Sequence, residues 1–159
     1  MRIGFGYDSH RFVHGRRLIL GGVEIPYEEG LLGHSDADAL VHAVCDAILG
    51  ALSEGDIGKH FPDTDPTYRG ISSLRLLSDV GTLAARKGCS VNNVDSTVVI
   101  ERPKLQGYIH EMSSNIAGSL NITQESVNIK ATTNEGMGFV GRNEGVAAFA
   151  VVTLWEKED

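Results

Sequence analysis

The chain has 159 residues, the length of one domain, and we expect a single domain over residues 1–159. Its formal net charge of −7 disfavours nucleic acid as a partner, because binding to that polyanion depends on lysine and arginine. Two cysteines, Cys45 and Cys89, are too few for a disulfide framework. The low cysteine count favours a reducing cytosolic setting, most simply that of a bacterium. The sequence shows no signal-like or membrane-spanning apolar run, so we expect no membrane partner.

The first predicted elements are two strands and a helix. Residues 2–7 and 17–25 carry alternating or β-branched apolar side chains, which is typical of strands. A helix is predicted from about 36 to 52, because apolar residues recur there at helical spacing. Ser35 and Asp38 resemble a capping box at its start.

Strands and helices interleave along the rest of the chain. The predicted elements are a loop over 54–70, a helix over 72–87, a strand over 91–100, a helix from Pro103 to Leu120 that stops at Asn121, and strands over 127–132 and 146–155. No strict βαβ repeat is present. We therefore expect an α+β fold, with one mixed β-sheet and helices packed on one face.

Two of these elements carry possible metal ligands. Asp8 and His10 are two residues apart at a strand end, so their side chains share one side. His42 shares a helix face with Asp38 and Asp46, and this polar stripe should face away from the apolar one. Two imidazoles and one carboxylate are a common ligand set for catalytic zinc. The spacing alone favours an alternative without metal, in which Asp8 caps a turn, His10 is solvated and His42 is a partly buried histidine. Asp46 either orients the His42 ring or is a solvated helix residue.

Two further segments suit a phosphate. His34 and Ser35 lie at the predicted helix start, where free N–H groups favour an anion, although Ser35 could serve only as a cap. Residues 132–135 follow a predicted strand and combine hydroxyls, a carboxylate and backbone amides. They could cradle a diphosphate and hold a second, harder cation, although a plain hairpin connection is favoured by the pattern alone.

Six motifs occur together along nearly the whole chain: GYDSH at 6–10, HSDAD at 34–38, the helix with His42, DIGKHFPDTDP at 56–66, RPK at 102–104 and KATTNEGMGFVGR at 130–142. Together they resemble the 2-C-methyl-D-erythritol 2,4-cyclodiphosphate synthases of the non-mevalonate isoprenoid pathway. The resemblance implies a homotrimer, with sheets packed around a threefold axis and active sites at subunit interfaces. It also implies conversion of 4-diphosphocytidyl-2-C-methyl-D-erythritol 2-phosphate to the cyclic diphosphate with release of CMP.

Carried over residue by residue, the resemblance implies that Asp8, His10 and His42 hold one zinc ion per subunit. It implies that Glu135 holds magnesium or manganese bound with the substrate, and that His34 and Thr133 stabilise the transition state. All of these except His42 should also contact the substrate. The other implied contacts are Ser35; Asp56, Ile57 and Gly58 near the erythritol; a flexible loop of Phe61, Pro62, Asp63, Thr64 and Asp65; a cytidine pocket of Ile100, Lys104, Leu105, Gln106, Ala131 and Thr132; and Asn134, Phe139 and Arg142, the last two also near a trimer-axis cavity.

The chain departs from the usual family pattern at Ala37, where HSDGD is common, at Asn134, and at Asn143, where GRGEG is common. None of these changes removes an implied ligand. Two other functions would use the same features. One is a metal-dependent nucleotide pyrophosphohydrolase, and the other is a noncatalytic trimer that binds isoprenoid diphosphates in its axial cavity.

Overall fold

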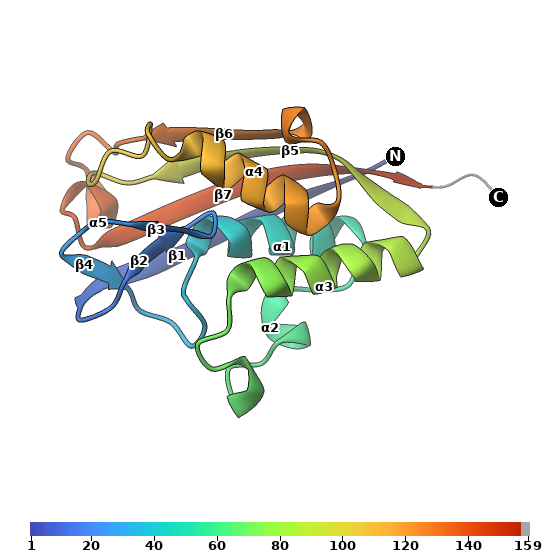
Figure 1. Cartoon of the computed structure of the whole chain (residues 1–159), viewed down its shortest axis with the longest axis horizontal. Coiled ribbons are helices and arrows are strands. Elements are labelled where there is room, and N and C mark those ends of the chain that lie inside the picture. The colour runs from blue at the N-terminus through green and yellow to red at the C-terminus, as the bar shows by residue number, and fades with distance from the viewer. Residues whose placement is uncertain (157–159) are drawn as a thin grey trace.

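A five-stranded sheet forms the framework of the molecule. The computed structural model describes residues 1–156. Across the sheet, the strands lie in the order β4 (Glu29–Leu31), β1 (Arg2–His14), β7 (Gly145–Glu156), β5 (Cys89–Val99) and β6 (Val127–Thr132) (Figure 1). β5 and β6 are parallel, whereas the other neighbours are antiparallel. The predicted mixed sheet is therefore confirmed.

A second, two-stranded sheet was not predicted. It pairs β2 (Leu18–Leu20) with β3 (Val23–Ile25) in antiparallel register. The single strand expected over 17–25 is wrong because Gly21 and Gly22 both have positive φ angles, 57° and 72°, and turn the chain between the two strands.

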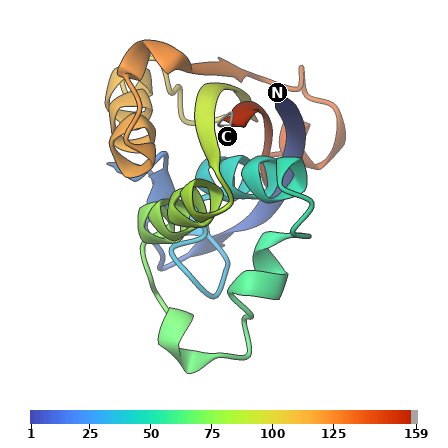
Figure 2. The ribbon, with the colours of Figure 1, turned by 90° about the vertical axis from the view of Figure 1, so that its right-hand side faces the viewer.

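The helices cover one face of the large sheet, as predicted, and leave the other uncovered (Figures 1 and 2). The three longer helices are α1 (Ala39–Ala51), α3 (Ser73–Arg86) and α4 (Ile109–Leu120); short turns are α2 (Ile57–His60), η1 (Pro66–Tyr68), η2 (Gln124–Ser126) and α5 (Gly138–Gly141). In β7, Ala148, Ala150 and Val152 are buried under helices, while Phe149 and Val151 are exposed. Within residues 1–156, no helix has the length and apolar character needed to cross a bilayer.

Two other segment predictions are wrong. The loop expected over 54–70 contains α2 and η1, each begun by an aspartate: Asp56 accepts the Lys59 N–H and Asp65 accepts the Thr67 N–H. The helix expected to open at Pro103 begins only at Ile109, because the intervening residues form turns.

Two other helix predictions are confirmed. Asn121 ends α4 in the left-handed conformation, with a φ of 53°. α3 lies within the helix predicted over 72–87.

Asp38 begins α1 in place of Ser35, and it is fully buried. Its carboxylate accepts N–H groups from Val41 at 3.1 Å, Gly21 at 3.0 Å and Gly22 at 2.7 Å. Burial, with the nearby charge of Asp36, raises the pKa of Asp38 to about 6, although the three N–H groups oppose the shift. The expectation that this side chain lies on a stripe facing away from the apolar one is therefore wrong: it ties the β2–β3 turn to the start of α1.

α1 lies directly against the backbone of β1. A Cβ atom built on Gly6 would lie 1.9 Å from the Ala43 carbonyl oxygen, and one on Gly4 would lie 1.7 Å from that of Ala47. Both distances are far below van der Waals contact, so only glycine permits this approach. The contact places His42 of α1 over Asp8 and His10 of β1.

Gly6→Ala should therefore destabilise the fold by about 3 kcal/mol, because the new methyl group must push a helix backbone away from the sheet. Urea denaturation at matched chain concentration measures the change. Gly118→Ala is the matched control, since a Cβ there meets no atom within 4 Å and replaces a helical glycine. The control should be neutral or slightly stabilising. A Gly6→Ala protein as stable as the parent would contradict this account of the α1 contact.

Candidate metal and substrate site

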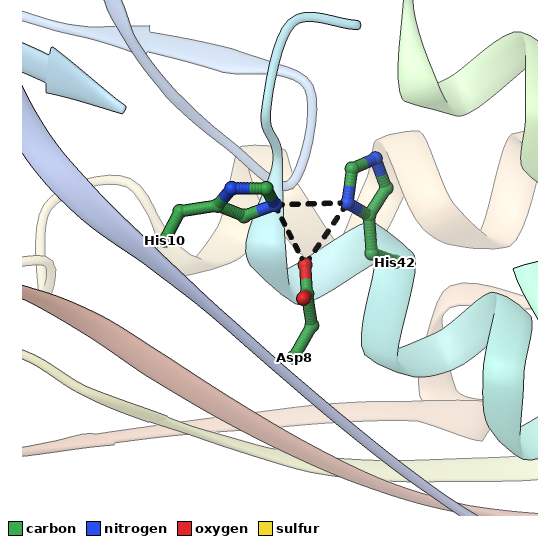
Figure 3. A group of neighbouring side chains, drawn as sticks. All are labelled: Asp8, His10 and His42. Carbon is green, nitrogen blue, oxygen red and sulfur yellow. Dashed lines mark hydrogen bonds and ion pairs between the residues drawn. The ribbon is translucent and has the colours of Figure 1, made fainter. Parts of the chain in front are cut away.

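Asp8, His10 and His42 converge on one point between β1 and α1 (Figure 3). Asp8 Oδ2 lies 2.9 Å from both His10 Nε2 and His42 Nδ1, and the two nitrogens are 3.2 Å apart. Within residues 1–156, no other three acidic, histidine or cysteine side chains bring ligand atoms this close together. The structure thus assembles a triad that could hold a metal ion.

The surroundings of His10 fix which of its nitrogens can bind a cation. His10 Nδ1 lies 2.7 Å from the Leu32 carbonyl oxygen. A carbonyl only accepts hydrogen bonds, so Nδ1 carries the hydrogen of the neutral ring, and Nε2 is the nitrogen that can bind a cation once it has lost its own proton. A carboxylate oxygen and imidazole nitrogens facing one point are the donors that a divalent transition metal requires, so the residues fit such an ion.

Ionisation of the triad favours a cation. Burial opposes the ionised form of Asp8, but hydrogen bonds from His10 and His42 outweigh it and lower the pKa of Asp8 to about 2. Burial likewise disfavours the charged form of His10, but the hydrogen bond and charge of Asp8 raise its pKa overall. Asp8 is therefore a carboxylate at neutral pH. A metal must displace protons from this site, so its affinity should fall as the pH falls.

The triad opens into a cavity of about 590 Å³. The cavity extends from β1 and α1 to α2 and the segment that follows it, which projects away from the sheet (Figure 1). Of the predicted site residues, the cavity wall contains Asp8, His10, His34, Ser35, His42, Ile57, Gly58, Phe61, Pro62, Asp63 and Thr64. Asp56 and Asp65 do not line it and instead begin the helical turns α2 and η1.

A second cavity, of about 430 Å³, lies between the end of β6 and the turns before α4. It is lined by Ile100, Lys104, Leu105, Gln106, Ala131, Thr132 and Thr133 of the predicted set, together with Glu101, Pro103 and Ile109. It shares no lining residue with the cavity of the triad. Within one chain, most of the residues predicted to bind the substrate therefore fall into two separate groups.

A model of the YgbB family matches residues 1–155. The chain belongs to this family. It is 63% identical to the 2-C-methyl-D-erythritol 2,4-cyclodiphosphate synthase of Syntrophus aciditrophicus (strain SB) over 159 residues, covering 100% of both chains. The family resemblance found in the sequence is confirmed.

Solved structures agree with this membership. The bifunctional IspDF of Campylobacter jejuni superposes with a TM-score of 0.94 at 41% identity, covering 99% of this chain and 42% of that longer one. A 2C-methyl-D-erythritol-2,4-cyclodiphosphate synthase described as a CDP-bound form gives a TM-score of 0.89 at 38% identity, covering 97% of this chain and 100% of that one.

In this YgbB-family chain, Glu135 lies outside the metal triad. Its carboxylate is exposed and accepts the Thr133 hydroxyl at 3.3 Å. Two of the backbone amides around it already have a partner in this structure. Glu101, which the sequence did not single out, accepts the N–H of Asn134 at 2.7 Å and that of Gly136 at 3.4 Å. Glu101 thus holds the backbone of residues 134–136 by two hydrogen bonds.

Backbone amides at the start of α1 also have hydrogen-bond partners within the chain. Ser35 Oγ accepts the Ala37 N–H and Asp36 accepts the Asp38 N–H, each at 3.2 Å, so these amides are not free for an anion. His34 turns toward the next segment, where its Nε2 lies 3.1 Å from the Asp65 carbonyl oxygen. His34 therefore links the start of α1 to the loop that forms the far side of the cavity.

Asp46 does not orient His42. It accepts the backbone N–H of Ile57 at 2.7 Å and so positions α2. The other nitrogen of His42, Nε2, instead faces the hydroxyls of Ser73 at 2.8 Å and Ser35 at 3.2 Å. Ser73 lies 31 residues away in sequence, so helical spacing around His42 gave no signal for it.

Phe139 and Arg142 lie apart from both main groups. Phe139 lines a third cavity of about 430 Å³ with Ser9, His10, Arg11 and Glu144. Arg142 does not line it, but its guanidinium pairs with the Glu144 carboxylate at 2.8 Å. Because His10 borders this cavity and that of the triad, the two are neighbours.

Two departures from the usual family pattern share a backbone conformation. Ala37 and Asn143 have φ angles of 60° and 57°, in the left-handed region where glycine is least strained. Asn143 tolerates this region better than alanine does, and its side-chain amide donates to the Tyr27 hydroxyl at 2.9 Å. Ala37 is fully buried, so its turn is held by packing.

His42→Ala should abolish metal binding, because it removes one of three converging ligands. Metal content of the purified protein, measured by atomic emission, tests this. His60→Ala is the matched control: His60 bonds the Glu54 carbonyl and lies outside the triad. The control should keep the metal content of the parent. Full metal content in His42→Ala would refute the triad as the binding site.

Proposed function

We propose that this chain is a 2-C-methyl-D-erythritol 2,4-cyclodiphosphate synthase, over the whole of its length as one domain. The observation that carries the proposal is the cavity in which Asp8, His10 and His42 converge, in a chain 63% identical to a curated synthase over its full length. The substrate is 4-diphosphocytidyl-2-C-methyl-D-erythritol 2-phosphate, and the products are the 2,4-cyclodiphosphate and CMP.

In this reaction, an oxygen of the 2-phosphate forms a bond to the β-phosphorus of the same molecule. The bond from the β-phosphorus to the bridging oxygen breaks, and CMP leaves with that oxygen. The enzyme must bend a flexible anion until the attacking and departing oxygens are in line, so most of the catalysis is positioning and charge stabilisation. The cavity wall from Ile57 to Thr64 suits this task, since it can enclose the erythritol and exclude competing water.

Asp8, His10 and His42 hold one zinc ion per subunit in this proposal. Two imidazole nitrogens and one carboxylate oxygen are a donor set that suits zinc. Bound there, zinc would supply Lewis-acid polarisation of the substrate's phosphate. His34 lies on the same cavity wall, and its Nε2–H, which faces the Asp65 carbonyl in this structure, could donate to the charge that develops on the phosphate once the substrate displaces that carbonyl.

Glu135 holds the second cation, magnesium or manganese, in this proposal. Such ions bind through one or two carboxylates completed by substrate phosphate oxygens, and the exposed Glu135 carboxylate fits that description. Thr133, whose hydroxyl lies beside this carboxylate, would contact the same diphosphate. A cation bound at Glu135 would offset the negative charge that develops on the departing CMP.

The complete site is shared between subunits of a homotrimer in this proposal. Two facts support sharing: the triad and the second cavity are separate within one chain, and the uncovered sheet face is apolar. On that face Phe5 is 62% exposed, and the tilted rings of Tyr7 and Phe149 pack with their centroids 5.1 Å apart. Packing of three such faces around an axis removes this surface from water.

The second cavity binds the cytidine in this proposal. A related synthase structure is described as a CDP-bound form, which supports a cytidine site without locating it. Ile100, Leu105 and Ile109 give the cavity apolar walls for a base, and Lys104 adds a positive charge for a phosphate. We place the activity in the bacterial cytosol, where the buried and unpaired Cys45 and Cys89 would remain reduced.

Incubation with the cytidylyl substrate and magnesium, followed by phosphorus NMR, should show CMP and a cyclic diphosphate. His42→Ala should lower this turnover by about 100-fold or more. CMP together with an open-chain bisphosphate would instead identify a pyrophosphohydrolase. No CMP at all from metal-loaded protein would favour the noncatalytic trimer.

A subunit-mixing experiment tests the shared site. His42→Ala and Lys104→Ala chains should each be inactive, because each lacks one half of every site. When they are unfolded and reassembled together in equal amounts, random mixing restores roughly a quarter of the sites to two intact halves. Mixed trimers, identified by native mass spectrometry, should therefore recover activity. Mixed trimers as inactive as their parents would show that each site lies within one chain.

A further inference from the structure

A chain of hydrogen bonds leads away from the metal triad behind His42. His42 Nε2 lies 2.8 Å from the hydroxyl oxygen of Ser73, and that hydroxyl donates to Asp36 Oδ1. Ser73 is the first residue of α3 and is fully buried. Asp36 also accepts the backbone N–H of Ser73 at 2.9 Å and that of Asp38 at 3.2 Å. These donors all point at the Asp36 carboxylate.

The hydrogens in this chain can be assigned from donor and acceptor chemistry. A carboxylate only accepts, so the single hydroxyl hydrogen of Ser73 is directed at Asp36. The Ser73 oxygen then faces His42 with a lone pair, and His42 Nε2 must be the donor. In the neutral ring, this leaves the lone pair on Nδ1, the atom that lies 2.9 Å from Asp8 Oδ2.

We propose that Ser73 and Asp36 are positioning residues for the metal site: they fix the tautomer and orientation of His42 so that its Nδ1 faces the ion. Outer hydrogen-bond partners of this kind commonly change metal affinity by about 10- to 100-fold. The inference rests on the metal site proposed above, but not on the reaction that the site performs.

Ser35 is the competing partner, since its hydroxyl lies 3.2 Å from the same nitrogen. That hydroxyl also accepts the Ala37 N–H, and its contact with His42 is 0.4 Å longer than that of Ser73. Ser73 is therefore assigned the main role.

The alternative to positioning is a purely structural role, in which Ser73 and Asp36 only join the start of α3 to the segment before α1. A structural role predicts loss of stability, whereas positioning predicts loss of zinc affinity in a protein that remains folded. The two can be separated by measuring both quantities on the same variants.

Ser73→Ala should bind zinc about 10- to 100-fold more weakly than the parent, measured without substrate by chelator competition on the metal-free protein. The matched control is Ser72→Ala, because Ser72 is exposed and its side chain makes no capping bond. The control should bind zinc as the parent does. Thermal unfolding of the same metal-free samples shows that each variant is folded at the assay temperature.

Asp36→Asn provides a second route that does not remove the serine. Because Asp36 acts through Ser73, the double variant should bind zinc little more weakly than Ser73→Ala alone. Zinc affinity within about twofold of the parent in Ser73→Ala, equal losses in Ser72→Ala, or additive losses in the double variant would each overturn the proposal. A failure of the synthase reaction would leave these zinc affinities unchanged, so the two proposals fail separately.

Discussion

The contact between α1 and the two glycines of β1 is the constraint on which the site depends. Glycine at positions 4 and 6 lets a helix backbone approach a strand backbone without intervening side chains. His42 thereby reaches Asp8 and His10, which follow Gly4 and Gly6 on the same face of β1. Any side chain at these positions would act as a spacer between the ligands. The metal triad is thus a product of backbone packing as much as of its own residues.

Polar groups inside the fold are arranged around this contact. Asp38 is buried with three backbone donors, which keeps the start of α1 fixed against the β2–β3 turn. Asp46 holds α2 by one backbone bond, and His34 reaches the loop beyond it. Asp46 and His34 thus tie α2 and η1, neither of which contains a buried residue, to α1 and the segment before it.

The sequence predicted the features that depend on local pattern. The mixed sheet, helices over 36–52 and 72–87, and Asn121 as a stop follow from periodicity and capping chemistry, and they are confirmed within a few residues. Spacing alone left the metal site open, and the family motifs decided it.

What the sequence missed depends on distant partners. Ser73 faces His42, and Glu101 occupies the amides of Asn134 and Gly136; both pairings join residues more than thirty positions apart. The burial of Asp38 could not be predicted because its donors come from the β2–β3 turn, within a segment whose pattern predicts one strand.

The position of β7 between β1 and β5 has a consequence for synthesis on the ribosome. β7 contains residues 145–156, yet it pairs with β1, whose first residue, Arg2, lies opposite Leu154. The centre of the sheet therefore remains empty until residues 145–156 have been translated. A chain that stops before β7 leaves open edges on β1 and β5, and such edges are templates for aggregation.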